Sequence, residues 1–223
     1  MMLKFFGEIH HVLKGSCFTY TLAQALGLKE SELLKLLKDL PECRTRAYYS
    51  QEFVSEVLTY LDLEYELVDC FTFEYDYFEQ VISEALYCGH KVLICYNARK
   101  GAPLLGKKAV PETGHYCEIL DIIGDTIRGR QSNVDGEHEG VLRNISLATL
   151  WEASTAIRGM KVNYGQILNC KITVGKHAVE TATRCGKQIC PMTKKSRCRF
   201  YSDMGGVVII IKLSLIHISE PTR

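Results

Sequence analysis

A cysteine and a histidine stand in this sequence where nucleophilic thiol chemistry would need them. Cys17 follows Gly15-Ser16 and opens an apolar run to Leu26 that has the composition of a helix. The start of a helix carries partial positive charge and unpaired N–H groups, and both stabilise a thiolate. His115 opens a later apolar segment with the composition of a strand. This order predicts a thiol nucleophile, Cys17, and its general base, His115.

A third residue is needed on the far side of the imidazole to fix its tautomer and orientation. Side chains alternate along a strand, so His115 shares a face with the odd-numbered residues of its own strand. Pairing the apolar faces of the predicted hairpin matches odd with odd residues. This parity favours Asn133, then Asp135, and Gln131 if the turn is tighter. The competing interpretation is that residues 132–136 form only a polar turn.

The oxyanion stabiliser is the less defined part of the predicted site. His11 lies six positions before Cys17, with His10 beside it. A suitably protonated His11 could donate a hydrogen bond, supplemented by the backbone N–H of Cys17. The alternative is that both histidines are simply exposed.

A long irregular loop is expected over residues 97–113, directly before His115, and long loops in compact domains are often functional. It carries four cations that would complement an acidic substrate: Arg99, Lys100, Lys107 and Lys108. The alternative is an ordinary solvated insertion.

The elements that must position these residues are helices first and an antiparallel sheet afterwards. Apolar periodicity predicts helices over 17–26, 31–40, 50–61 and 75–87, strands over 64–69 and 91–96, and a hairpin of 116–123 with 126–132. Ser31, Ser50 and Ser146 are the expected helix N-caps, and 160–167 is expected as a closing strand. This order describes an α+β domain.

Composition narrows the function classes. The chain has 223 residues, a formal net charge of +1 and 47% hydrophobic residues, enough for one domain with a sizeable core. The near-neutral charge disfavours nucleic acid as a partner. The sequence has no run of about 18 apolar residues, so no membrane span is expected. Of the ten cysteines, seven are scattered through the predicted helices and strands without a framework spacing, which indicates free thiols in a reducing cytoplasm.

The C-terminal part differs in character. Residues 171–212 contain Cys185, Cys190 and Cys198, but even with His177 the spacing lacks a C-x-x-C pair, so no metal site is expected and no cofactor is indicated. This segment is of uncertain origin, frameshifted or untranslated sequence being one interpretation. Its apolar run 207–211 is read as either a last strand or noise. Residues 213–223 resemble the translation of a sequencing adapter and are expected to be an artefact.

The chain resembles the papain-like cysteine peptidases of the bacteriocin-leader-peptidase type and, within them, the actin maturation proteases. The matching features are Gly-x-Cys opening a Leu/Ala-rich helix, the helix over 50–61, Gly89-His90-Lys91-Val92-Leu93-Ile94-Cys95-Tyr96 before a charged loop, Gly114-His115-Tyr116, and Gln131-Ser132-Asn133. Two features depart from the family: Phe18 replaces a glycine after the nucleophile, and no glutamine precedes it at the usual place.

The resemblance implies a papain-like fold over residues 1–170 and a Cys-His-Asn mechanism. It also implies a cytosolic aminopeptidase that removes the acetylated N-terminal residue of immature actin. Two other functions are compatible with the same residues. One is a thiol acyltransferase or amidase, which would differ only in the acceptor, and the other is a binding module in which Cys17 is inert.

Overall fold

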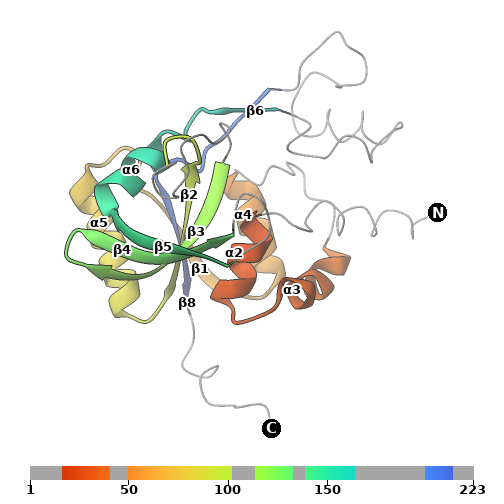
Figure 1. Ribbon diagram of the computed structural model, residues 1–223. Coiled ribbons are helices and arrows are strands. Elements are labelled where there is room, and N and C mark those ends of the chain that lie inside the picture. The colour runs from red at the N-terminus through yellow and green to blue at the C-terminus, as the bar shows by residue number, and fades with distance from the viewer. Residues whose placement is uncertain (1–16, 41–49, 102–113, 133–138, 164–198, 213–223) are drawn as a thin grey trace.

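A six-stranded antiparallel sheet organises the fold (Figure 1). The computed structural model describes residues 17–40, 50–101, 114–132, 139–163 and 199–212. Neighbouring strands pair antiparallel throughout this sheet. Across the sheet the strands follow the order β1 (Glu64–Asp69), β8 (Val207–Lys212), β2 (Lys91–Asn97), β3 (Gly114–Ile123), β4 (Thr126–Ser132) and β5 (Glu139–Ser146).

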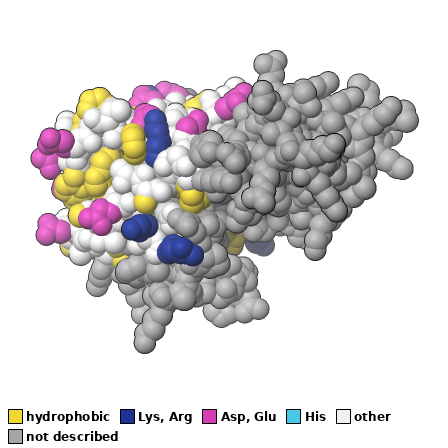
Figure 2. Space-filling model, turned by 90° about the horizontal axis from the view of Figure 1, so that it is seen from above, with side chains coloured by type: hydrophobic (Ala, Val, Ile, Leu, Met, Phe, Trp, Pro, Cys, Tyr) yellow, Lys and Arg dark blue, Asp and Glu magenta, His cyan; other side chains and the backbone are white. Residues whose placement is uncertain are grey.

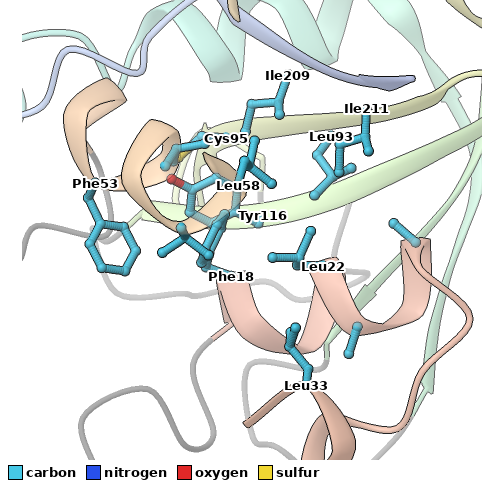
Figure 3. Close-up of a cluster of buried hydrophobic side chains, with 14 of the residues drawn as sticks. Phe18, Leu22, Leu33, Phe53, Leu58, Leu93, Cys95, Tyr116, Ile209 and Ile211 are labelled. Carbon is cyan, nitrogen blue, oxygen red and sulfur yellow. The ribbon is translucent and has the colours of Figure 1, made fainter. Parts of the chain in front are cut away.

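The N-terminal helices pack on one face of the sheet. They are α2 (Cys17–Ala25), α3 (Glu30–Leu36), a 3₁₀ turn (Leu37–Asp39) and α4 (Gln51–Tyr60). Their apolar residues form one buried core with strand residues such as Leu93 and Ile209 (Figure 3). The expected α+β class, with N-terminal helices packed on an antiparallel sheet, is therefore confirmed.

A second helical layer covers the opposite face (Figure 1). It consists of α5 (Tyr75–Tyr87) and α6 (Leu147–Thr155), which bury Phe78, Ile82 and Leu150 against residues such as Ile94 and Val208. Because β2 and β8 are covered on both faces, they read as almost continuous apolar runs rather than as alternating ones.

Two of the three expected helix caps are confirmed. The Ser50 hydroxyl accepts the Phe53 N–H at 3.1 Å, and the Ser146 hydroxyl accepts the Thr149 N–H at 3.1 Å. The prediction for Ser31 is wrong, because α3 begins one residue earlier and Lys29 is its N-cap. The Glu32 carboxylate accepts the Lys29 N–H at 2.8 Å and so supplies the cap from within the helix.

The C-terminal strands agree with expectation in part, since 207–211 is the last strand that was one of its two interpretations. The described part of the predicted closing strand is β6 (Lys161–Asn163), which pairs with β7 (Arg199–Tyr201) in a separate two-stranded sheet. The run 207–211 is a strand, β8, and lies between β1 and β2. The domain therefore includes residues beyond the expected boundary at 170. Residues 171–198 and 213–223 lie outside the described part of the chain.

Strand direction gathers several segments at one end of the sheet. Both β1 and β2 run antiparallel to β8, so both finish at the end where β8 starts and where β3 also starts. In Figure 1 this is the upper end, opposite the end at which β8 finishes. Among the helices that the structure describes, none has the length and apolar character to cross a bilayer.

Candidate active site

The first turn of α2 is held against the start of β3. The Phe18 ring packs edge-on against Tyr116 of β3, with ring centroids 5.1 Å apart, and against Phe53 of α4 at 5.6 Å (Figure 3). The buried Thr21 hydroxyl donates a hydrogen bond to the Tyr116 carbonyl oxygen at 3.3 Å. Cys17, the first residue of α2, therefore lies at the end of the sheet where β3 begins with Gly114 and His115.

The environment of Cys17 differs from that of the other described cysteines. Its side chain is partly exposed at a helix N-terminus, whereas Cys70, Cys95 and Cys117 are buried. Burial, with a smaller contribution from the charge of Asp69, raises the pKa of Cys70 to about 11. Burial also raises the pKa values of Cys95 and Cys117 well above the usual thiol range. These buried thiols stay protonated. Cys88 is exposed, but it follows the last turn of α5 and so lies at the negative end of a helix, unlike Cys17.

His115 belongs to a buried group of polar side chains on β2, β3 and β4. It is 4% exposed and pairs in register with Tyr96, whose ring stands perpendicular to the imidazole at 5.5 Å between centroids. The Tyr96 hydroxyl donates a hydrogen bond to the side-chain carbonyl oxygen of Gln131, which is also 4% exposed. We call His115, Tyr96 and Gln131 the histidine cluster.

Electrostatics connect Cys17 with this cluster. Burial is the largest cause of the raised pKa values of Cys95 and Tyr96, and negative charge on Cys17 is a further cause in both. Cys95 and Tyr96 are neighbours in β2 and pair with Tyr116 and His115, respectively. Cys17 is therefore near the two β2 residues that pair with the start of β3.

Strand alternation sets how Cys17 and His115 could meet. Tyr116 belongs to the core under α2. His115 packs against Tyr96, which belongs to the core under α5 and α6, so His115 lies on the opposite face of the sheet from Tyr116. A contact between Cys17 and His115 thus has to be made around the start of β3, at the sheet end, rather than through the sheet.

A tight turn after β2 brings positive charge to the same end. The Asn97 side chain, 2% exposed, accepts the N–H groups of Arg99 and Lys100 at 3.0 and 3.1 Å. Asn97 also pairs with Gly114, the residue before His115. The exposed Arg99 and Lys100 therefore lie beside the start of β3, as expected, while Lys107 and Lys108 lie outside the described residues.

The hairpin register bears on the third member of the site. Cys117 pairs with Gln131 and Ile119 with Gly129, so odd residues match odd residues near His115, as expected. Beyond Ile119 the register shifts, which changes the parity toward the turn. Asn133 and Asp135, like His10 and His11, lie outside the described residues. Gln131, the third choice, contacts the Tyr96 hydroxyl.

Tyr96 is the member of the cluster that the sequence reasoning missed. Its signal was available, because a tyrosine inside an apolar strand needs a partner for its hydroxyl. What the sequence could not supply was the pairing with β3, which brings the ring against the imidazole of His115.

A second buried polar group lies on the other face of the same hairpin. The fully buried Glu118 carboxylate accepts two hydrogen bonds from Arg130, at 2.6 and 2.9 Å, and its other oxygen is 3.8 Å from the Lys91 ammonium nitrogen. Arg130 also donates to the Gln24 carbonyl oxygen at 3.2 Å, near the end of α2. We call Glu118, Arg130 and Lys91 the charged cluster, and it ties α2 to the sheet.

The described residues contain no group of three or more histidine, cysteine, aspartate or glutamate side chains suited to hold a metal ion. Cys185, Cys190, Cys198 and His177 lie outside that part of the chain. The sequence matches no family model, and no curated protein is significantly similar to it.

Proposed function

We propose that this chain is a cysteine peptidase with a papain-like fold, in which Cys17 is the nucleophile and His115 the general base. The observation that carries the proposal is the position of Cys17, partly exposed at the start of α2 and at the sheet end where β3 begins with Gly114 and His115. A second support is that charge on Cys17 contributes, after burial, to the raised pKa values of Cys95 and Tyr96, the β2 partners of Tyr116 and His115. A helix start and a nearby imidazole both favour a thiolate.

The reaction would proceed in two halves. His115 takes the thiol proton, and the Cys17 sulfur attacks the substrate carbonyl carbon to give a tetrahedral oxyanion. The oxyanion accepts a hydrogen bond from the Cys17 backbone N–H, with His11 as the proposed second donor. Collapse breaks the C–N bond while His115 protonates the departing amine. His115 then deprotonates a water molecule, which attacks the thioester and releases the acid and the Cys17 thiol.

The imidazole must keep one orientation through both halves. Asn133 is the proposed acceptor on its far side, with Asp135 as the alternative. The Tyr96 ring, held by its hydrogen bond to Gln131, restrains the imidazole from the direction of the core. In this arrangement Tyr96 and Gln131 position His115 and do not contact the substrate.

The proposed substrate is an acetylated, acidic N-terminal segment such as immature actin presents. Arg99 and Lys100 are exposed beside the start of β3 and offer charge complementary to such a segment. Lys107 and Lys108 belong to the same proposed basic loop. The attraction of the exposed Arg99 and Lys100 for an acidic substrate would weaken as salt rises.

The test is cleavage of a peptide whose acetylated first residue is followed by acidic residues. We expect the intact chain to release the blocked residue, Cys17→Ala to lose turnover while unfolding at the same temperature, and Cys88→Ala to retain turnover. Activity retained in Cys17→Ala would overturn the proposal. Transfer of the acyl group to an added amine in preference to water would assign the same residues to an acyltransferase instead.

A further inference from the structure

The connection between β1 and α5 and the first turn of α5 display aromatic rings to solvent. Phe71, Phe73 and Tyr77 are 40%, 53% and 37% exposed. The rings of Phe73 and Tyr77 pack against each other, with centroids 4.5 Å apart. Single exposed aromatic residues are ordinary, but adjacent rings on one short segment mark a surface that can bind another molecule.

The backbone beneath these rings is held by hydrogen bonds. The Cys70 N–H donates to the Gly206 carbonyl oxygen at 2.9 Å, and the Phe73 N–H donates to the Cys70 carbonyl oxygen at 2.9 Å. The Phe71 N–H donates to the Asp69 carboxylate at 3.0 Å. A surface that is already ordered loses little conformational entropy on binding.

Asp69 and Phe71, at the start of this connection, already bind the guanidinium group of Arg158. Both terminal nitrogens of Arg158 donate to one Asp69 carboxylate oxygen, at 2.8 and 2.9 Å. The guanidinium carbon lies 4.6 Å from the centroid of the Phe71 ring. The segment therefore provides an internal example of one carboxylate and one aromatic ring holding an arginine.

A second set of carboxylates and rings lies next to this one and faces solvent. Glu74 and Asp76 are exposed and lie between Phe73 and Tyr77 in the sequence. The pKa of the neighbouring Tyr75 is raised to about 12, first by burial, then by a hydrogen bond to Glu79 and by surrounding acidic charges that include Asp76. In Figure 2, which looks down on this end, hydrophobic and acidic side chains gather on the left, the side on which Figure 1 shows α5.

We propose that the surface formed by Phe73, Glu74, Asp76 and Tyr77, the aromatic–acidic surface, binds an arginine-bearing segment of a partner protein. A guanidinium can stack on a ring and pair with a carboxylate at the same time, as Arg158 does. The two carboxylates disfavour an anionic lipid surface. Because β1 ends where β3 begins, the surface lies at the same end of the sheet as Cys17 and His115, but the inference does not depend on peptidase activity.

The test uses the full chain and a labelled peptide with two arginines spaced by glycine, followed by fluorescence anisotropy. The matched probe replaces both arginines with citrulline, which keeps the shape and removes the charge. We expect the arginine peptide to bind more tightly, and binding to weaken with added salt. Phe73→Ala and Asp76→Asn should each weaken binding by at least about threefold.

Tyr87→Ala is the control variant, because Tyr87 is 93% exposed at the other end of α5. It should leave the affinity unchanged. Equal affinity for the two peptides, absence of binding to the arginine peptide, or equal effects of Phe73→Ala and Tyr87→Ala would overturn the inference. Binding to phosphatidylcholine vesicles that Phe73→Ala abolishes, without binding to the peptide, would assign the surface to lipid instead.

Discussion

The hairpin of β3 and β4 carries two buried polar groups that differ in their chemistry. On the face under α2, the charged cluster joins the Glu118 carboxylate to Arg130 and Lys91. On the face under α5 and α6, the histidine cluster joins His115 to Tyr96 and Gln131 through a ring contact and a neutral hydrogen bond. One group holds fixed charges and the other holds an imidazole that can gain a proton.

This difference separates a structural role from a chemical one. A buried carboxylate that loses its cations is left as an uncompensated charge, so the charged cluster constrains the fold strongly. Arg130 extends that constraint to α2 through the Gln24 carbonyl oxygen. Imidazole changes its charge near neutral pH and is therefore suited to move protons. We expect substitutions in the two clusters to affect different measurements.

The largest expected effect is on turnover, in His115→Ala. Loss of a general base lowers turnover by roughly 10²- to 10⁴-fold, so kcat on the acidic acetylated peptide should fall by that factor. The matched variant is Glu118→Gln, on the same strand but the other face, which should retain kcat per folded molecule. If both variants lose turnover equally, the proposed separation of roles is wrong.

The charged cluster should determine stability instead. In Glu118→Ala the free energy of unfolding, measured by urea titration, should fall by about 2–3 kcal/mol. This is below the range for fully buried pairs, because Arg130 and Lys91 reach solvent. The remaining folded molecules should keep their kcat. A variant that is as stable as the original chain would show that Glu118 does not anchor the hairpin.

A smaller effect is expected within the histidine cluster, in Tyr96→Phe. The ring stays, but the Gln131 oxygen loses its donor, which costs about 1–3 kcal/mol of unfolding free energy. Gln131→Leu combined with Tyr96→Phe should cost less than the sum of the two single changes, because one hydrogen bond is removed in both. Strict additivity would show that the hydrogen bond does not couple the two residues. A shift in the pH profile of kcat would show that the pair also positions His115.

The smallest effect is expected at the exposed cations. Lys100→Glu should raise KM for the acidic peptide about two- to fivefold at low salt and leave kcat unchanged, because exposed charge pairs are weak. Lys35→Glu, on the exposed side of α3, is the control for total charge. Equal KM values in the two variants would remove Lys100 from substrate recognition.

Local sequence patterns predicted the elements whose signals are local. The bounds of β1 and α5 coincide with the predicted ranges, and the hairpin around Gly124-Asp125 was found from its alternation and turn. Ser50 and Ser146 were recognised as caps, because an N-cap and its helix are adjacent in sequence. These features placed Cys17 on a helix start and His115 on a strand start.

Long-range pairing set the limit of the sequence analysis. The run 207–211 is apolar enough for a buried strand, but nothing local indicates that it inserts between β1 and β2. For the same reason, the segment after Met160 was expected only as a closing strand, and its pairing with β7 was not predicted. The role of Tyr96 depends on its register with His115 and was equally inaccessible from one strand alone.

The central claim is that His115 promotes the thiolate of Cys17, and the rate of Cys17 alkylation by iodoacetamide against pH tests it most directly. Mass spectrometry can follow Cys17 and the exposed Cys88 in the same sample, so Cys88 is an internal reference. We predict rapid alkylation of Cys17 at mildly acidic pH in the original chain. In His115→Ala the midpoint of the Cys17 alkylation rate against pH should move up toward about pH 8.5, the range of an ordinary thiol. Identical pH dependence of Cys17 alkylation in the two proteins would contradict the account.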